Sequence, residues 1–269
     1  MRADLVPDDL WKRVAPLLPP APERRRRHPG RLRVPDRTAL AGVLFVLRTG
    51  VAWRDVPAET VGCSGVTAWR RLRDWTEAGV WPRLHAALLS ELRRADLLDL
   101  NDCSVDGSHV RALKRGDHVG PSPVDRARPG SKHHLIVDRH GTPLAVTLTG
   151  GNRHDVTQLL PLLDTVPPIR GLRGRPRRKP RRLYADRGYD FDKYRRLLRK
   201  RGIKPMIARR GVAHGSGLGK VRWVVERAFA WLHHFKRLRT RYERRADLHQ
   251  GLLELACSLI CLRRLRTSS

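Results

Sequence analysis

The sequence lacks any run of 18 or more consecutive apolar residues, and this absence excludes a membrane-spanning helix. Its first residues do not contain the apolar stretch of a secretory signal peptide. Cysteine is scarce, and the four residues present are too scattered for the disulfide framework of a small secreted protein. Together these absences favour a protein of the reducing cytoplasm.

Acidic residues are also few. The chain has 26 Asp and Glu against 56 Lys and Arg, which gives a formal net charge of +30. A surplus of this size indicates a polyanionic partner, and nucleic acid is the default choice. A GC-rich genome that favours arginine codons would explain why 47 of the basic residues are Arg and 9 are Lys. It would not explain the excess of basic over acidic residues, so nucleic-acid binding is the favoured interpretation.

The positive charge is unevenly distributed along the chain. Residues 1–100 contain 18 basic and 12 acidic side chains, a net of +6, and residues 101–269 contain the other 38 and 14, a net of +24. Hydrophobic residues make up 40% of the chain, enough to form a folded core. We therefore predict two domains, a helical one over 1–98 and a very basic one over 99–269.

The front part shows the apolar spacing typical of helices. The segments with this spacing are 5–18, 36–49, 53–59 and 80–97, with a further helix after a turn at 62–65. A basic linker over 23–35 separates the first two helices and contains four consecutive arginines at 24–27. This linker could contact phosphates or a minor groove, or it could be a solvated tether.

The helix that follows the turn carries apolar residues on one side and arginines on the other. The apolar stripe consists of Val66, Trp69, Leu72 and Trp75, and the outer arginines are Arg70, Arg71 and Arg73. A helix, a short glycine-containing turn and a helix with a basic outer face are typical of a helix-turn-helix DNA reader. An ordinary three-helix core with solvated arginines would give the same pattern. We expect the three arginines to contact DNA.

From residue 101 onward the pattern alternates between strands and helices. Strands are predicted at 103–110, 134–137, 144–148, 183–185 and 203–208, and helices at 155–164, 190–201, 220–238 and 246–264. Basic loops rich in Gly and Pro lie at 114–131 and 170–182. This order predicts an α/β fold, with a mixed sheet flanked by helices, preceded by the all-α front part.

Acids are so scarce in the second part that three of them stand out by their positions. Asp106 lies within the first strand, Asp186 at the end of the fourth, and Glu226 on the late helix. Three carboxylates brought together would form a site for a hard cation such as Mg²⁺. Two such ions can activate an attacking oxygen and stabilise a leaving one in phosphodiester chemistry.

Each of these acids also has a structural interpretation. Asp106 precedes a Gly-Ser pair and could form a turn, and Asp186 could cap the helix that follows it. Glu226 could simply pair with Arg222, four residues earlier on the same helix. Spacing alone does not decide between a surface ion pair and a metal ligand at Glu226.

Several stretches resemble the IS5 family of bacterial insertion-sequence transposases, within the DDE superfamily. They are VAWRDVP (51–57), SVDGSHVRA (104–112), GSKHHLIVDRHGTPLAV (130–146), TGGNRHDVTQL (149–159), LYADRGYD (183–190) and KVRWVVERAFAWL (220–232). The resemblance implies an RNase H-like catalytic domain whose triad is Asp106, Asp186 and Glu226. It also implies catalysis with two Mg²⁺ ions per site, for which Mn²⁺ can substitute.

A member of this family is expected to act on double-stranded DNA. It would bind the terminal inverted repeats of its element, free a 3′-OH there by cleavage, and join that 3′-OH to target DNA by direct transesterification. The basic loops 114–132 and 170–182 would neutralise phosphates, so affinity should fall steeply with salt. Synapsis of two ends implies a homodimer or a higher assembly, and the resemblance implies a cytoplasmic protein associated with the nucleoid.

The family's signature on the acidic helix consists of a Tyr, then an Arg, then the Glu, then a Lys. Arg222 and Glu226 match this signature, but Gly219 stands at the Tyr position and His233 at the Lys position. The sequence does not say which residues take over these two roles.

The cation missing from the signature could come from Lys236 or Arg237. Together with Arg222, these two residues are therefore expected DNA contacts. The stretch 152–155, with Asn152, His154 and Asp155, matches another recurring segment of such enzymes and is expected near the site.

Three other functions remain open at this point. A stand-alone RNase H-like nuclease would share the triad but would cleave DNA without joining it. A non-enzymatic DNA-binding regulator would use the helix-turn-helix and would not need Asp106. A zinc protein is the third alternative, and its ligands would come from His133, His134, His154, Cys257 and Cys261. No CxxC or HxxxH pairing stands out in this sequence.

Overall fold

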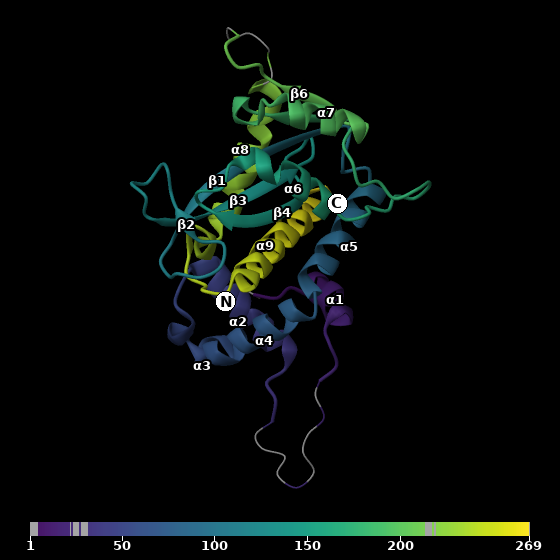
Figure 1. Cartoon of the computed structure of the whole chain (residues 1–269). Coiled ribbons are helices and arrows are strands. Elements are labelled where there is room, and N and C mark those ends of the chain that lie inside the picture. Colours follow the sequence, from purple (N-terminus) through teal and green to yellow (C-terminus); the bar gives the residue numbers. More distant parts are fainter. Residues whose placement is uncertain are drawn as a thin grey trace.

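The computed structural model describes residues 5–21, 23, 27, 32–212, 217 and 219–268. Most helices of the front part lie at one end of the molecule, and a mixed β-sheet forms its centre (Figure 1). A long C-terminal helix packs against both. The predicted α/β class, with a mixed sheet flanked by helices and preceded by a helical front part, is confirmed.

The helices of the front part follow the predicted apolar spacing. They are α1 (Asp8–Val14), η1 (Ala15–Leu17), α2 (Asp36–Thr49), η2 (Trp53–Asp55), α3 (Ala58–Val61), α4 (Gly65–Glu77) and α5 (Val80–Arg94). The helix predicted over 36–49 has these same ends. It stops at Gly50, whose left-handed backbone (φ +76°) suits a residue without a Cβ. The basic linker lies largely outside the described residues, which include only 23, 27 and 32–35 of it.

The turn between α3 and α4 is built by small residues. The Ser64 hydroxyl accepts a hydrogen bond from the backbone N–H of Thr67 at 3.3 Å and so caps α4. Gly65 admits no side chain, because a Cβ there would lie 1.6 Å from the carbonyl oxygen of Trp53. The prediction that Val66 belongs to the buried stripe is wrong: it is 53% exposed, and Gly65 and Ala68 face the core in its place.

The sheet has a mixed strand order. Its strands are β1 (Asp102–Ala112), β2 (Gly120–Pro121), β3 (Pro129–Val137), β4 (Pro143–Gly150), β5 (Arg182–Ala185), β6 (Lys204–Ile207) and β7 (Thr240–Arg241). Strand β3 pairs antiparallel with both β4 and β1, whereas β1, β5 and β6 run parallel to one another. Apart from the two-residue strands β2 and β7, the resulting order is β4-β3-β1-β5-β6.

Helices cover the sheet and connect its strands. They are η3 (Asp155–Gln158), α6 (Leu159–Thr165), η4 (Arg187–Tyr189), α7 (Asp192–Lys200), α8 (Gly219–His234), η5 (Lys236–Leu238) and α9 (Ala246–Thr267). Strand β3 begins five residues before its predicted start, because the polar run ahead of His134 is buried rather than part of the loop. Among the described residues, no helix combines the length and the apolar character needed to cross a membrane.

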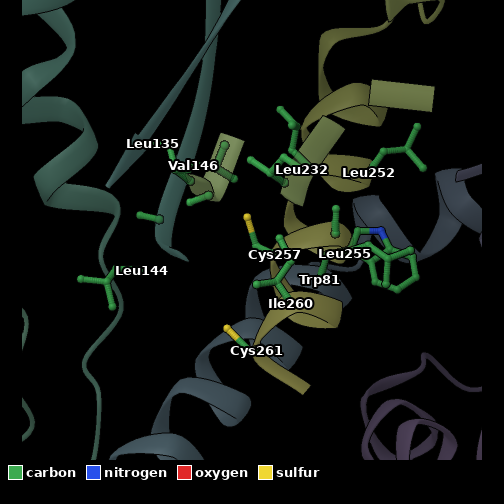
Figure 2. Packing of buried hydrophobic residues seen from close by; sticks show 14 of the residues in the cluster. Trp81, Leu135, Leu144, Val146, Leu232, Leu252, Leu255, Cys257, Ile260 and Cys261 are labelled. Carbon is green, nitrogen blue, oxygen red and sulfur yellow. The ribbon is translucent and has the colours of Figure 1, made fainter. Parts of the chain in front are cut away.

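Helix α9 joins the front part to the sheet. Its apolar side chains pack against α5 and β4, and Figure 2 shows Cys257 and Ile260 in this layer together with Trp81 of α5 and Val146 of β4. All four cysteines are buried and free, as expected for Cys257 and Cys261 in a core helix. One hydrophobic cluster runs from α1 to α9, so the boundary between residues 98 and 99 stays a prediction.

Candidate active site

Two of the three predicted acids lie on neighbouring parallel strands. The last residues paired between β1 and β5 are Ser104 and Tyr184. Asp106 and Asp186 each follow two residues later, and the backbone of Asp186 is still extended. Adjacent strands are about 4.8 Å apart. The fold therefore brings Asp106 and Asp186 to the same level of the sheet.

The third acid, Glu226, is linked to Asp106 by a shared arginine. Helix α8 packs on β1, and Arg222 of α8 donates one hydrogen bond to Asp106 Oδ2 at 2.7 Å and another to Glu226 Oε1 at 2.6 Å. The ion pair between Arg222 and Glu226 is therefore present, as the structural interpretation of Glu226 required. It is not isolated on the helix surface, however, because the same guanidinium also holds the acid of β1.

Negative charge is only partly compensated at this position. Burial and, to a smaller extent, the charge of Asp186 raise the pKa of Asp106 to about 6, although the Gly107 N–H and Arg222 favour its ionised form. Burial and the nearby carboxylates raise the pKa of Tyr189 well above its ordinary value. The hydroxyl of Tyr189 is buried and has no hydrogen-bond partner among the described residues.

The chemistry of these side chains fits a hard divalent cation. Carboxylate oxygens are the ligands that Mg²⁺ prefers, and neighbouring carboxylates repel one another unless a cation lies between them. Within the described part of the chain, no three His, Cys, Asp or Glu side chains already form a metal-sized cluster. The Arg222 guanidinium, itself a cation, lies between Asp106 and Glu226 instead.

Asp155, at the end of the stretch 152–155, lies next to Gly107, the residue that follows Asp106 on β1. Asp155 Oδ1 lies 3.0 Å from Lys132 Nζ and 3.8 Å from His134 Nδ1. A Cβ on Gly107 would come within 2.8 Å of the same oxygen, so a larger residue there would displace the Asp155 carboxylate. The sequence analysis did not select Lys132 and named His134 only as a possible zinc ligand, although charged and polar residues within a strand were a usable signal.

Comparison with known proteins decides the family. The profile described as "Transposase DDE domain" matches residues 99–261, well over half of the chain, and one described as "Putative transposase of IS4/5 family" matches residues 6–85. The chain belongs to the transposase DDE domain family. The resemblance to insertion-sequence transposases is thereby confirmed at the level of the IS4/5 family.

Individual relatives agree with this assignment. The "Putative transposase for insertion sequence element IS402" of Burkholderia cepacia is 67% identical over 148 residues, which are 55% of this chain and 70% of that protein. The "Insertion element IS402 uncharacterized 16.2 kDa protein" of the same organism is 54% identical over 124 residues, which are 46% of this chain and 84% of that protein.

Among solved structures, the Mos1 strand transfer complex is similar at a TM-score of 0.34 and 14% identity. The match covers 90% of this chain and 79% of that chain.

Membership of the family gives the class of reaction. The chain is an insertion-sequence transposase of the DDE type, a metal-dependent enzyme that cleaves DNA and transfers strands. Transposases of this type act with a divalent metal ion, and DNA is their substrate.

The arginines expected to read DNA from α4 differ in their surroundings. Arg70 is exposed. Arg71 Nε lies 3.0 Å from Asp36 Oδ1, and this half-buried ion pair joins α4 to α2. Arg73 pairs with the neighbouring Asp74 at 2.8 Å. Of the three, Arg70 is therefore the exposed one, whereas Arg71 and Arg73 are partly buried and held in ion pairs.

Arg237, an expected DNA contact, is buried in this structure. The residue is 4% exposed, because its guanidinium is enclosed by Glu243 at 2.7 Å and by the carbonyl oxygen of Val51 at 3.1 Å. Lys236 is exposed and stays a predicted contact. His233 is partly buried and stacks on a phenylalanine of α8, so it does not supply the cation that the signature places there.

The loop 170–182 lies away from the acids, and the phosphate contacts expected of it stay a prediction. It leads into β5, whose opposite end carries Asp186. The cations at the C-terminal ends of β5 and β6 are instead Arg209 and Arg210, which the sequence analysis did not select. Arg210 donates hydrogen bonds to the carbonyl oxygens of Arg187 and Gly188, directly after Asp186.

Proposed function

We propose that this chain binds the terminal inverted repeats of its insertion sequence and carries out cleavage and strand transfer with two Mg²⁺ ions. Asp106, Asp186 and Glu226 would hold the ions, with Mn²⁺ as a substitute. The observation that carries the proposal is the Arg222 guanidinium bridging Asp106 and Glu226, at the strand level that Asp186 also occupies. A cation already holds together two acids that are 120 residues apart in the sequence.

A backbone N–H fixes one oxygen of each sheet-borne acid, and Arg222 holds the other oxygen of Asp106. The N–H of Gly107 donates to Asp106 Oδ1, and the N–H of Gly188 donates to Asp186 Oδ1, each at 2.8 Å. These hydrogen bonds orient the two carboxylates before a ligand arrives. When bound, divalent ions would supply charge stabilisation for the attacking and leaving oxygens of a phosphodiester.

Exposed cations near these acids would hold the DNA backbone. Arg209 and Arg210 follow β6 at the end of the sheet that carries Asp186, and both are exposed. Arg70 on α4 and Lys236 would contact DNA further away, at the end repeats. Two element ends must be held at once during transposition, so we propose that a homodimer or a larger assembly forms on DNA.

A cleavage and joining assay tests this function. The substrate is a duplex that carries an element end with its genomic flank, incubated with Mg²⁺, with Mn²⁺ or with a chelator. Asp106→Asn, Asp186→Asn and Glu226→Gln should each lower cleavage by at least about 100-fold and leave duplex affinity unchanged. Asp164→Asn, which alters an exposed acid on α6 that pairs with Arg201, is the matched control and should cleave normally.

The outcomes separate this proposal from its rivals. Cleaved but never joined products would indicate a nuclease. Binding without cleavage by the unaltered chain would indicate a regulator. Normal cleavage by any one of the three acid variants would remove that acid from the site.

A further inference from the structure

The loop that leads from α6 into β5 is strongly basic and carries no acid. Loop 170–182 contains seven arginines and one lysine, and it has no Asp or Glu. It projects outward beside the C-terminal end of α5 (Figure 1). The four residues of β5 separate its end from Asp186, which is a distance of about 13 Å along a strand. The loop therefore meets a different part of any bound DNA than the acids do.

The base of this loop is fixed to the fold. The backbones of Ile169 and Arg177 exchange two hydrogen bonds, at 2.9 and 3.0 Å, and so close the segment between them. Ile169 is fully buried, and its carbonyl oxygen also accepts a hydrogen bond from Arg93 of α5. The backbone N–H of Arg170 donates to the Ser90 hydroxyl of the same helix at 3.2 Å. The tip of the loop, residues 172–176, is therefore held out at a defined place.

The tip places a glycine between two unpaired arginines. Arg173, Gly174 and Arg175 are exposed, and neither guanidinium has a hydrogen bond or an ion pair within the described part of the chain. Gly174 has a left-handed backbone (φ +80°), and a Cβ built on it would meet nothing within 4 Å. Pro176 follows and has no N–H. The result is a thin piece of backbone with a cation on either side of its centre.

The surroundings of this tip are unusual for the exposed surface of the chain. Exposed arginines elsewhere have a counter-charge, as in the pairs that Arg201 forms with Asp164 and Arg209 with Asp192. Leu172, next to the unpaired arginines, is 79% exposed, more than any other large apolar side chain in the described ranges. A single exposed leucine is ordinary. Beside cations without counter-charges, it offers apolar carbon to the walls of an anionic partner.

We propose that the tip 172–176 binds in the minor groove of an A·T-rich duplex. The minor groove is about 6 Å wide, so it suits a backbone without a side chain at its centre better than a helix. Over A·T tracts it narrows further, and its negative potential there attracts arginine. Gly174 lies on the floor of the groove, and Arg173 and Arg175 extend along it in both directions. Leu172 contacts the deoxyribose walls.

The chemistry of the groove distinguishes this contact from binding to phosphates. A·T pairs present only acceptors in the minor groove, whereas G·C pairs add the amino group of guanine. Guanidinium groups donate hydrogen bonds and cannot accept them, so they match A·T pairs. Arginine is also more weakly hydrated than lysine and enters a narrow groove at a lower cost. The inference goes beyond the proposed reaction, because it concerns recognition of DNA away from the three acids.

Short duplexes that are identical except for one central tract test the proposal. The tract consists of A·T, G·C or inosine·C pairs. Inosine lacks the amino group of guanine, so an inosine·C pair resembles A·T in the minor groove and G·C in the major groove. Affinity is measured by fluorescence anisotropy, with the full chain in chelator, so that no cleavage occurs. The unaltered chain should bind the A·T and inosine·C duplexes at least about fivefold more tightly than the G·C duplex.

Two double variants show whether the tip is the reader. Arg173→Ala combined with Arg175→Ala should abolish the preference and weaken binding of the A·T duplex at least about fivefold. Arg173→Lys combined with Arg175→Lys keeps the charge and the affinity for the G·C duplex, but should lose most of the preference. Arg178→Ala removes an exposed arginine of the same loop outside the tip. It is the matched control and should leave the preference unchanged.

Several results would overturn the proposal. They are equal affinity of the unaltered chain for all three duplexes, an inosine·C duplex bound like the G·C duplex, and a preference that persists undiminished in either double variant. Loss of self-association in the alanine variant with unchanged affinity for DNA would assign the tip to a protein contact and also overturn it.

The test is independent of catalysis. If the unaltered chain shows the preference but never cleaves, minor-groove binding by the tip stands and the proposed reaction fails. If the chain cleaves and joins DNA but binds the three duplexes equally, the reaction stands and the role of the tip fails.

Discussion

Two arginine–carboxylate clusters lie at opposite ends of the segment formed by α8 and η5, and they differ in how well their charges are balanced. At one end Arg222 serves both Asp106 and Glu226, and the pKa of Asp106 is raised to about 6. At the other end Arg237 and Glu243 are almost fully buried as a pair. Burial alone would raise the pKa of Glu243, but neighbouring donors lower it to about 2.

The difference in charge balance suggests a structural role for the Arg237 cluster and a cation-binding role for the Arg222 cluster. Glu243 is held by Arg237 on one oxygen, and His249 Nδ1 lies 3.3 Å from the other. Its charge is fully compensated by the protein, and the pair ties η5 to the carbonyl oxygens after α2. At the Arg222 end the compensation is incomplete. An acid cluster that the protein leaves short of positive charge is suited to bind a cation from solution.

The largest effect on stability is expected at the compensated cluster. Glu243→Gln leaves the Arg237 guanidinium buried without a counter-charge and should lower the free energy of unfolding by ~3–5 kcal/mol. Urea denaturation measures this change. Glu77→Gln, which alters an exposed carboxylate paired with Arg245 at 2.8 Å, is the control and should cost less than ~1 kcal/mol. Equal losses for the two variants would remove the distinction between the clusters.

The opposite sign is expected at the uncompensated cluster. Without metal, Asp106→Asn should raise the free energy of unfolding at pH 7.5, by up to ~3 kcal/mol, because the fold disfavours the ionised carboxyl of Asp106. Urea denaturation in chelator measures the gain.

The dependence of this gain on pH follows from the sign of the shift. The folded pKa of about 6 lies above the ordinary value of 3.8, so the carboxylate destabilises the fold fully above pH 6. This penalty fades as the pH falls from 6 towards 3.8, since the folded state then takes up a proton. The advantage of Asp106→Asn should therefore shrink between pH 7 and pH 4. A constant advantage over that range would contradict a raised pKa.

Local sequence patterns predicted the elements of the fold more reliably than the environment of single cations. Apolar spacing placed the helix over 36–49 correctly, because that signal is repeated every turn. The strand carrying Asp106 was recognised from an alternating apolar run, which is also a repeated local signal. The burial of Arg237 left no such signal, since it depends on a carbonyl group 186 residues away in the sequence. The position of loop 170–182 likewise left no signal in its composition. It follows from the direction of β5, which the loop enters at the end opposite to Asp186.

The acids of the candidate site were selected from the sequence, and its supporting residues were not. Asp106, Asp186 and Glu226 were selected from their scarcity and from family resemblance. Lys132 and Tyr189 were missed, because what marks them is burial beside carboxylates, which only the folded chain creates.

A smaller effect should separate two neighbouring arginines of α4. Arg70 is exposed and would contact a phosphate or base, so Arg70→Ala should weaken end binding and reduce the salt dependence of the affinity by about one charge. Arg71→Ala breaks the ion pair with Asp36, so its main effect should be on stability. Fluorescence anisotropy across a salt series, with urea denaturation alongside, distinguishes the two. Unchanged end binding in Arg70→Ala would exclude this face of α4 as the reading surface.

Direct titration with Mn²⁺, read by electron paramagnetic resonance, tests most directly whether the undercompensated acids are a cation site. The unaltered chain should bind Mn²⁺, and Asp106→Asn, Asp186→Asn and Glu226→Gln should each lower the affinity about tenfold or more. Asp164→Asn should bind as the unaltered chain does. Mn²⁺ affinity that is the same in all five proteins would contradict the account.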